Sequence, residues 1–313
     1  MPSQRGKRHL ATWGASVACL LIGASAALAQ DKTFDLKFSH WVPPTHPLQK
    51  AMEEWGASVE KASNGTIKFK IFPSQQLGKA FDHYDMARDG IADFTYVNPG
   101  YQPGRFPIIA AGELPFLVGD AKGGIRAVDA WYRKYAANEM KDVKYCFSFI
   151  LDPLTWHSSK KKITVPGDIK GMKVRPSQAT VAAWVTLLGV DKVTKYHMDA
   201  PLHTVTFQWL MSPRTYAAMS PAQKKVIDDH CTTEWAGKFA DPWADFEHAG
   251  LAKVKAEPGH EVYTITDAQL NEWKKSAEPL EKQWADNVRK AGGDPDAIMK
   301  ELKQSLAQNK AAY

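Results

Sequence analysis

The most constraining feature of this 313-residue chain is a repeated change of hydrophobic period between residues 34 and 97. Apolar and polar residues alternate at 34–39, 66–72 and 91–97, as they do in strands with one buried face. Between these segments, residues 48–62 and 79–89 carry apolar side chains at helical spacing. Alternating strands and helices joined by short links predict a βαβαβ unit with a parallel sheet, which places the chain in the α/β class.

Three residues follow the expected strands at the edge where sheets of this kind bind ligands. His40 and Trp41 come directly after the first strand, and Asn98 comes after the third. In open α/β sheets, ligands sit outside the carboxyl ends of the strands. We therefore take His40, Trp41 and Asn98 as candidate ligand contacts. An ordinary place in the hydrophobic core is the alternative for Trp41.

The rest of the chain alternates less regularly, and its last third is helical. Capping-box patterns at 220–223 and 266–269 each predict the start of a helix. We expect the first helix to run towards residue 256 with a kink at Pro242, and the second to reach about residue 291. The other expected elements are strands at 143–151 and 261–265, extended pieces at 160–166 and 171–174, a helix at 180–188 and a helix opened by Asp294.

The N-terminus has the three parts of a secretory signal peptide. A basic segment at 5–8 is followed by an apolar stretch at 10–26 and an A-x-A site at 27–29. A transmembrane anchor is the alternative, but the apolar stretch is short and contains glycine, serine and threonine. We predict that residues 1–29 are a signal peptide, that the mature chain begins at Gln30, and that it works outside the cytoplasm.

The charge of the chain argues against nucleic acid as a partner. Lysine and arginine number 40 and aspartate and glutamate 34, so the formal net charge is +6. Removal of residues 1–29, with three basic side chains and no acidic one, leaves 37 − 34 = +3. That excess is too weak to indicate a nucleic-acid-binding surface.

Cys146 and Cys231 are the cysteines that remain after the expected cleavage. In an oxidising compartment they could pair. However, Cys146 lies in an apolar, strand-like segment and Cys231 in a helix-like one. We therefore expect two separate buried thiols and keep a disulfide as the alternative.

Motifs of common enzymes and cofactor sites are missing from the sequence. It contains no glycine-rich dinucleotide or phosphate-binding motif, no serine nucleophile elbow, and neither H-E-x-x-H nor C-x-x-C. His40 and His46 flank a proline-rich turn, but the histidines do not fall at the spacings of metal ligands. We expect a binding protein without metal or cofactor rather than an enzyme.

Three segments carry a resemblance to a known family. They are F-P-S-Q-Q-L-G at 72–78, the stretch 90–116 with G-I-A-D-F, N-P-G-Y, R-F-P and E-L-P-F, and V-P-G-D-I-K-G-M-K-V-R at 165–175. Together they resemble the extracytoplasmic solute receptors of TRAP transporters, the tripartite ATP-independent periplasmic systems. The likeness covers nearly the whole mature chain.

The resemblance implies a periplasmic receptor with the two-lobed fold of periplasmic binding proteins and a long helix linking the lobes. Lobe I would comprise residues 30–152 and 211–250, and lobe II residues 153–210 and 251–313. Such a receptor closes on a small organic acid. It hands the acid to a permease that consists of a small and a large membrane subunit and is driven by an ion gradient.

The resemblance also assigns a carboxylate clamp. Arg175 ends the third segment and matches the family arginine that grips the ligand. A planar guanidinium can donate two parallel hydrogen bonds to one carboxylate. Trp156 and Ser177 are weaker candidates in the second lobe. A surface arginine and a core tryptophan are the alternatives for Arg175 and Trp156.

One departure from the family pattern bears on binding. Residues 187–190 run directly into 191–196, where the family would have an intervening stretch of about 30 residues, the size of one βαβ crossover. That stretch would face Arg175, so its absence predicts an incomplete lobe II and impaired binding. Two alternatives therefore stay open: a truncated, binding-impaired relative, and an extracytoplasmic enzyme acting on a carboxylate.

Overall fold

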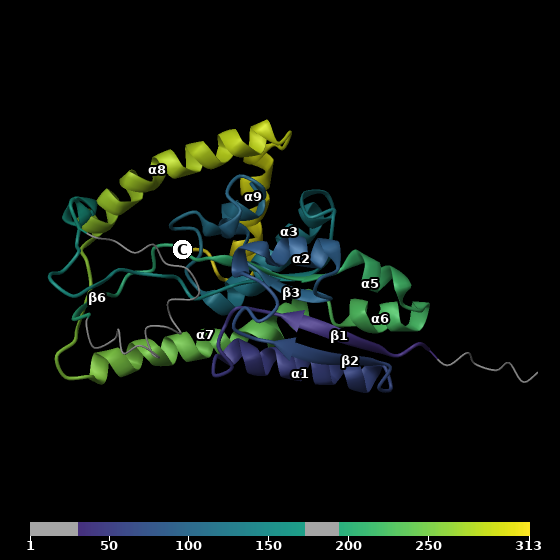
Figure 1. The fold of residues 1–313 in the computed structure, drawn as a ribbon. Helices are drawn as coiled ribbons and strands as arrows, with labels where there is room; N and C mark the ends of the chain where they lie inside the picture. The colour runs from purple at the N-terminus through teal and green to yellow at the C-terminus, as the bar shows by residue number, and fades with distance from the viewer. Residues whose placement is uncertain (1–30, 173–193) are drawn as a thin grey trace, which may run out of the picture. The chain divides into compact units, whose positions relative to one another are not determined.

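The computed structural model describes residues 31–172 and 194–313, and a five-stranded mixed sheet forms its main core (Figure 1). The strand order is β2-β1-β3-β7-β4. β1 pairs in parallel with β2 and β3, whereas β7 runs antiparallel to β3 and β4. The five strands are β1 Phe34–Ser39, β2 Ile67–Phe72, β3 Phe94–Val97, β4 Lys144–Ile150 and β7 Thr206–Met211.

The predicted βαβαβ unit is confirmed. α1 (Pro47–Ala62) connects β1 to β2, and α2 (His83–Asp89), preceded by a short 3-10 turn, connects β2 to β3. The imidazole of His46 caps the start of α1 by accepting a hydrogen bond from a first-turn backbone N–H at 3.1 Å. Gly90 ends α2 with a φ of 74°, a left-handed conformation that glycine adopts without steric strain.

The elements that are not predicted from the sequence include α3 (Ala121–Glu139) and β7. All six residues of β7 are buried, so the strand lacks the alternation that marks a strand with one solvent-facing side. The first turn of α3 contains Gly123 and Gly124, which weaken the helical pattern. Asp120 compensates, because its side chain accepts a hydrogen bond from the Gly123 backbone N–H at 2.7 Å.

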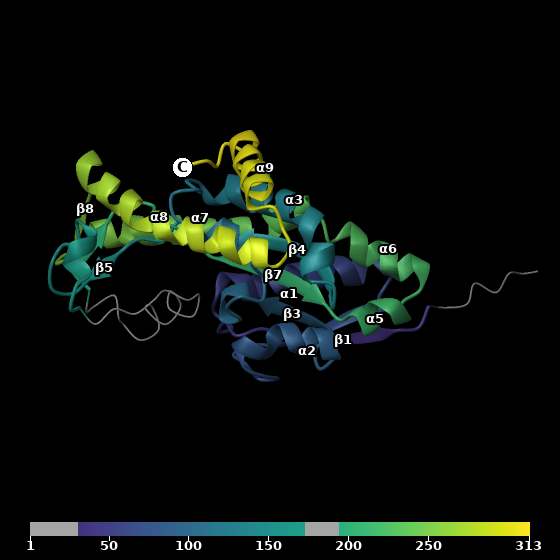
Figure 2. The ribbon, with the colours of Figure 1, turned by 90° about the horizontal axis from the view of Figure 1, so that it is seen from above.

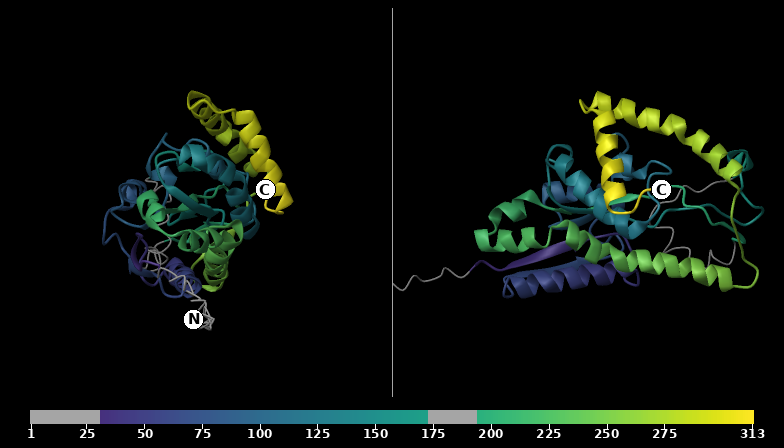
Figure 3. Two further views of the ribbon diagram at one scale, coloured as in Figure 1. Left: turned by 90° about the vertical axis from the view of Figure 1, so that its right-hand side faces the viewer. Right: turned by 180° about the vertical axis from the view of Figure 1, so that it is seen from behind.

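Helices cover both faces of this sheet. α1 and α7 (Thr233–Ala256) lie side by side (Figure 3) and pack over aromatic side chains of the central strands. The ring centroid of Phe38 lies 4.7 Å from that of Trp209 and 5.5 Å from that of Trp55. α3 packs against β4, and α9 (Pro295–Gln308), capped by Asp294 as predicted, packs against α3 (Figure 2).

The helix expected from residue 220 to 256 is instead two helices. α6 (Pro221–Asp229) opens with the predicted capping box, and α7 begins anew at Thr233. The chain breaks between them because Thr232 takes an extended conformation and its side chain caps α7. Pro242 lies inside α7, as expected. The short helix α5 (Pro213–Ala218) precedes α6.

A second, three-stranded sheet has the order β5-β6-β8. Its strands are β5 His157–Ser158, β6 Tyr196–Met198 and β8 Glu261–Tyr263. α8 (Asp267–Lys290) follows β8 and opens with the predicted capping box. The extended piece expected at 160–166 forms no strand, and the helix expected at 180–188 lies outside the described residues.

The fold is therefore α/β with two sheets, and the long helix α7 contacts β4 of one sheet and β8 of the other. This agrees with the expected periplasmic-binding-protein fold and its long helix. The expected boundary between residues 210 and 211 falls inside β7. The division of the chain into two lobes otherwise stays a prediction. None of the helices in the described ranges is both long enough and apolar enough to cross a bilayer.

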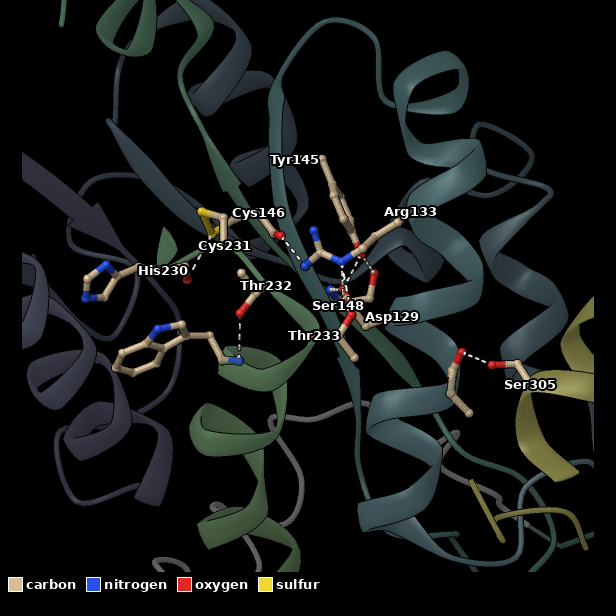
Figure 4. A network of polar contacts seen from close by, with 12 residues as sticks. Asp129, Arg133, Tyr145, Cys146, Ser148, His230, Cys231, Thr232, Thr233 and Ser305 are labelled. Carbon is tan, nitrogen blue, oxygen red and sulfur yellow. Dashed lines mark hydrogen bonds and ion pairs between the residues drawn. A yellow bond between two sulfur atoms is a disulfide. The ribbon is translucent and has the colours of Figure 1, made fainter. Parts of the chain in front are cut away.

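Cys146 and Cys231 form a disulfide, so the expectation of two separate thiols is wrong (Figure 4). The pairing of β4 with β7 shifts by one residue between Tyr145 and Phe147, which leaves Cys146 as the extra residue of a bulge. A bulge re-aims a side chain, and here the two Cα atoms lie 4.3 Å apart. The apolar sequence around Cys146 predicts a regular strand, and the bulge that turns this side chain towards Cys231 has no such signal.

A buried carboxylate next to this disulfide ties α3, β4 and α7 together (Figure 4). Asp129 of α3 is fully buried. Its Oδ1 accepts hydrogen bonds from the Tyr145 hydroxyl at 2.6 Å and the Ser148 backbone at 2.7 Å. Its Oδ2 accepts from Arg133 Nε at 2.6 Å and from the Thr233 hydroxyl at 2.5 Å. The charge is thus both paired and fully hydrogen-bonded, which a buried carboxylate requires.

Candidate ligand-binding site

The parallel pairing of β1 and β3 brings their carboxyl ends to one edge of the five-stranded sheet. Ser39, the last residue of β1, is in register with Thr95 of β3. His40 and Trp41 follow β1, and Asn98 follows β3, so the structure places these three predicted residues at the same edge. Ligand contact by them stays a prediction.

His40 is fully buried and held within the fold. Its Nε2 lies 2.7 Å from Oε1 of Gln49 on α1. Burial lowers the pKa of His40 to about 4, so the ring is neutral at neutral pH. A neutral imidazole cannot supply positive charge for a carboxylate, which leaves that task to another residue.

Trp41 is packed among other rings. It is 3% exposed, and its ring stacks on that of Tyr96 with centroids 4.0 Å apart. Its indole Nε1 is buried and has no hydrogen-bond partner among the described residues. These contacts are those of a core aromatic residue with one donor left unsatisfied.

Asn98 borders a cavity of about 480 Å³. Its Oδ1 accepts a hydrogen bond from the backbone N–H of Gly100 at 2.8 Å, which fixes the turn after β3. The cavity lies between the segment that follows β3, the residues just before β7 and the second half of α8. Its lining consists of Asn98, Gly100, Tyr101, Gly104, Phe106, Pro107, Ala110, Glu113, Leu114, Pro115, His203, Thr204, Val205, Leu280, Gln283, Trp284 and Asn287.

Most of this lining was not predicted. Glu113 belongs to the E-L-P-F segment, where no local pattern separates it from the packing residues. The α8 side chains Gln283, Trp284 and Asn287 fall within an amphipathic helix, where nothing marks a cavity-facing residue. Tertiary packing of α8 brings them to the segment after β3, and the Trp284 indole donates a hydrogen bond to the Pro107 carbonyl at 2.8 Å.

Of the remaining candidates, only Trp156 lies among the described residues, and it is not at this edge. Trp156 packs with the small core of the second sheet, where its ring centroid lies 6.0 Å from that of Trp273. Arg175 and Ser177 lie outside the described residues. His46 caps α1, and residues 31–172 and 194–313 contain no group of three or more side chains suited to hold a metal ion.

Comparison with known proteins decides the family. The model of the bacterial extracellular solute-binding proteins of family 7, named DctP, matches residues 38–191 and 178–287. The chain belongs to this family. It is a TRAP solute-binding protein by family, and these proteins are receptors rather than enzymes.

Individual relatives agree with this assignment. A solute-binding protein of Albidiferax ferrireducens is 28% identical over 159 residues, which are 48% of this chain and 46% of that protein. The chain thus spans about half the length of the curated relatives that it matches first.

Solved TRAP solute-binding proteins cover much more of the chain. One from Rhodoferax ferrireducens, in complex with copurified benzoate, is 25% identical with a TM-score of 0.81 and covers 89% of this chain and 99% of its own. One from a marine metagenome, in complex with 3-hydroxybenzoate, is 28% identical with a TM-score of 0.78 and covers 89% and 99%.

The family model matches two ranges of the chain, and these ranges overlap at residues 178–191. This interval includes Val190, and the resemblance to the family predicts about 30 further residues after it. The interval lies outside the described residues.

Proposed function

We propose that this TRAP solute-binding protein binds a small carboxylic acid outside the cytoplasm and delivers it to a TRAP permease. The observation that carries the proposal is family membership over residues 38–287. Aromatic acids are the ligand class that we favour. The two solved relatives described above, which are 25% and 28% identical to this chain, are in complex with benzoate and 3-hydroxybenzoate.

Arg175 is the proposed carboxylate clamp. It stands at the end of the segment V-P-G-D-I-K-G-M-K-V-R, which resembles the family motif. The described part of the site supports this assignment, because burial keeps His40 neutral and another residue would then supply the positive charge. A bidentate guanidinium would supply both the charge and the orientation.

Export and delivery form the rest of the proposal. Residues 1–29 act as a signal peptide, the mature protein works in the periplasm, and the small and large permease subunits receive the ligand. The sequence pattern at 5–29 and the extracellular family support this. N-terminal sequencing of exported material should find Gln30 first, whereas an intact Met1 would contradict cleavage.

Binding is proposed to be weaker than in a complete receptor. The family stretch expected after Val190 would form one wall of the cleft, and the sequence runs directly from 187–190 into 191–196 without it. The truncated, binding-impaired relative is therefore the second candidate function.

A thermal-shift screen of the mature chain against carboxylic acids tests the proposal. Benzoate, 3-hydroxybenzoate and mandelate should raise the melting temperature more than matched neutral compounds such as benzyl alcohol. Arg88→Lys provides a control, because Arg88 is an exposed arginine paired with Asp85 at 2.6 Å. This variant should keep the response, whereas Arg175→Lys should lose it. No response to any acid would reject binding by this chain.

A further inference from the structure

The cavity of about 480 Å³ has a chemistry opposite to that of a carboxylate site. Its size falls within the range of ligand pockets, roughly 300–1,000 Å³. No lysine or arginine lines it in the described parts of the chain, whereas the carboxyl group of Glu113 does. An organic anion in this cavity would meet this carboxyl group, and the described lining offers it neither a lysine nor an arginine.

One oxygen of the Glu113 carboxyl group accepts hydrogen bonds from the protein. Its Oε1 accepts hydrogen bonds from the Thr206 backbone at 3.0 Å and the Thr206 hydroxyl at 2.8 Å. Within residues 31–172 and 194–313, these are the hydrogen bonds that the group accepts, and both go to the same oxygen. A Cβ added at Gly100 would lie 3.6 Å from Oε2, so this second oxygen faces the glycine turn that borders the cavity.

Burial raises the pKa of Glu113, because the charged form loses hydration that Thr206 does not fully replace. A cation placed near Oε2 would restore that stabilisation. A cation bound beside Glu113 would therefore be stabilised electrostatically more than a cation beside an exposed carboxylate.

Aromatic rings provide the second element of a cation site. Phe106 and Trp284 line the cavity, and the hydrogen bond from the Trp284 indole to the Pro107 carbonyl fixes the orientation of that ring. The guanidinium of Arg105 already lies 5.3 Å from the Phe106 ring centroid, held by Asp85 outside the cavity lining. Ring faces attract cations, and quaternary or substituted ammonium groups are bound in this way in proteins.

We propose that this cavity is a second ligand site, which binds a small organic ammonium ion. Glu113 is its counter-ion, Phe106 and Trp284 contact the alkyl or aromatic part of the ligand, and the side-chain oxygen of Asn287 accepts a remaining N–H group. The proposal goes beyond the carboxylate function and does not rest on it.

The position of the cavity suggests what occupancy would do. The second half of α8 forms one side, and the residues just before β7 form another. The first half of α8 contacts the segment that follows β5, because the Trp273 indole donates a hydrogen bond to the Thr164 carbonyl at 2.9 Å. A ligand under Trp284 would therefore restrain a helix that contacts both regions.

Calorimetry with phenethylammonium as the probe tests the proposal, using the mature chain in the presence and absence of saturating benzoate. We expect saturable binding, and we expect it to persist when benzoate is present. Glu113→Gln keeps an oxygen for Thr206 but removes the charge, and it should weaken amine binding about 10- to 100-fold, the value of one charged hydrogen bond.

Two further variants keep the test decisive if Glu113→Gln is unstable. Trp284→Leu should weaken amine binding without changing the response to benzoate. Glu54→Gln, an exposed carboxylate paired with Lys50 on α1, should leave amine binding unchanged. The proposal is overturned if phenethylammonium does not bind at millimolar concentration, if Glu113→Gln binds it as tightly as the parent, or if benzoate displaces it competitively. Failure of benzoate binding alone would reject the carboxylate proposal and leave this one standing.

Discussion

Cys146 at the bulge of β4 is bonded to Cys231 in the break between α6 and α7, 85 residues further along the chain. Cys146 is fully buried and Cys231 is 6% exposed. The bond joins the strand to the helix boundary at the point where Thr232 caps α7. Because it closes a long loop, it restricts the unfolded chain more than the folded one.

Removal of this disulfide should destabilise the protein. Cys146→Ala/Cys231→Ala should lower the free energy of unfolding by about 2–5 kcal/mol, the usual cost for a native disulfide. Urea denaturation of the parent and the double variant measures the difference. Detection of two free thiols in the native parent, or equal unfolding midpoints, would contradict the pairing.

Asp129→Asn should also be strongly destabilising. The substitution leaves Arg133 without its charged partner. It can also place an amide N–H₂ donor where Oδ2 now accepts hydrogen bonds from Arg133 and Thr233, so that donors face one another. Breaking one side of a buried ion pair costs about 3–5 kcal/mol. Asp286→Asn is the matched control, because the ion pair of Asp286 with Arg289 is solvent-exposed and should contribute little. Thermal unfolding that shows the same loss for both variants would contradict this account.

Three histidines form a row across the small sheet, and they predict a pH dependence of stability. Nδ1 of His157 lies 2.8 Å from Nδ1 of His197, and Nε2 of His197 lies 2.8 Å from Nδ1 of His260. Burial, followed by the neighbouring histidines, lowers the pKa of His197 to about 4, against an ordinary value of 6.5. The unfolded state then binds more protons between these values, so stability from this group is present above pH 6.5 and is lost as the pH falls towards 4.

Carboxyl groups such as Glu247, whose pKa burial raises to about 8, change the stability with pH in the opposite direction. A variant of His197 is therefore compared with the parent to isolate the contribution of His197. His197→Gln should be less stable than the parent at pH 7.5, and the difference should shrink by pH 5. Melting temperatures at the two pH values test this. A difference that stays constant with pH would show that His197 does not titrate as described.

The sequence predicted the local elements and missed those that depend on tertiary packing. The βαβαβ unit, the caps at Ser220, Thr266 and Asp294, and the positions of His40 and Asn98 at one edge of the sheet follow from short-range patterns. β7 is buried on both faces and carries no period, and the bulge that turns Cys146 towards Cys231 has no sequence signature. The cavity under α8 depends on residues about 180 positions apart, such as Pro107 and Trp284.

Restoring the family segment should strengthen ligand binding. For an intact receptor, a ligand at about 100 times its dissociation constant adds roughly 2.7 kcal/mol of stability, which corresponds to about 5–10 °C in melting temperature for a chain of this size. We expect a smaller shift with the chain as it stands. Insertion of a family-derived stretch of about 30 residues between Val190 and Asp191 should restore the full shift. A full shift without the insertion would show that the departure from the family pattern is harmless.

The central claim is that this TRAP solute-binding protein binds a carboxylate through Arg175. Isothermal titration of benzoate into the mature chain, its Arg175→Lys variant and the Arg88→Lys control tests it most directly. The account predicts saturable binding by the parent and the control, and a loss of about 2–5 kcal/mol for Arg175→Lys, because a lysine ammonium cannot donate the bidentate pair of hydrogen bonds. Affinity of Arg175→Lys within twofold of the parent would contradict the claim.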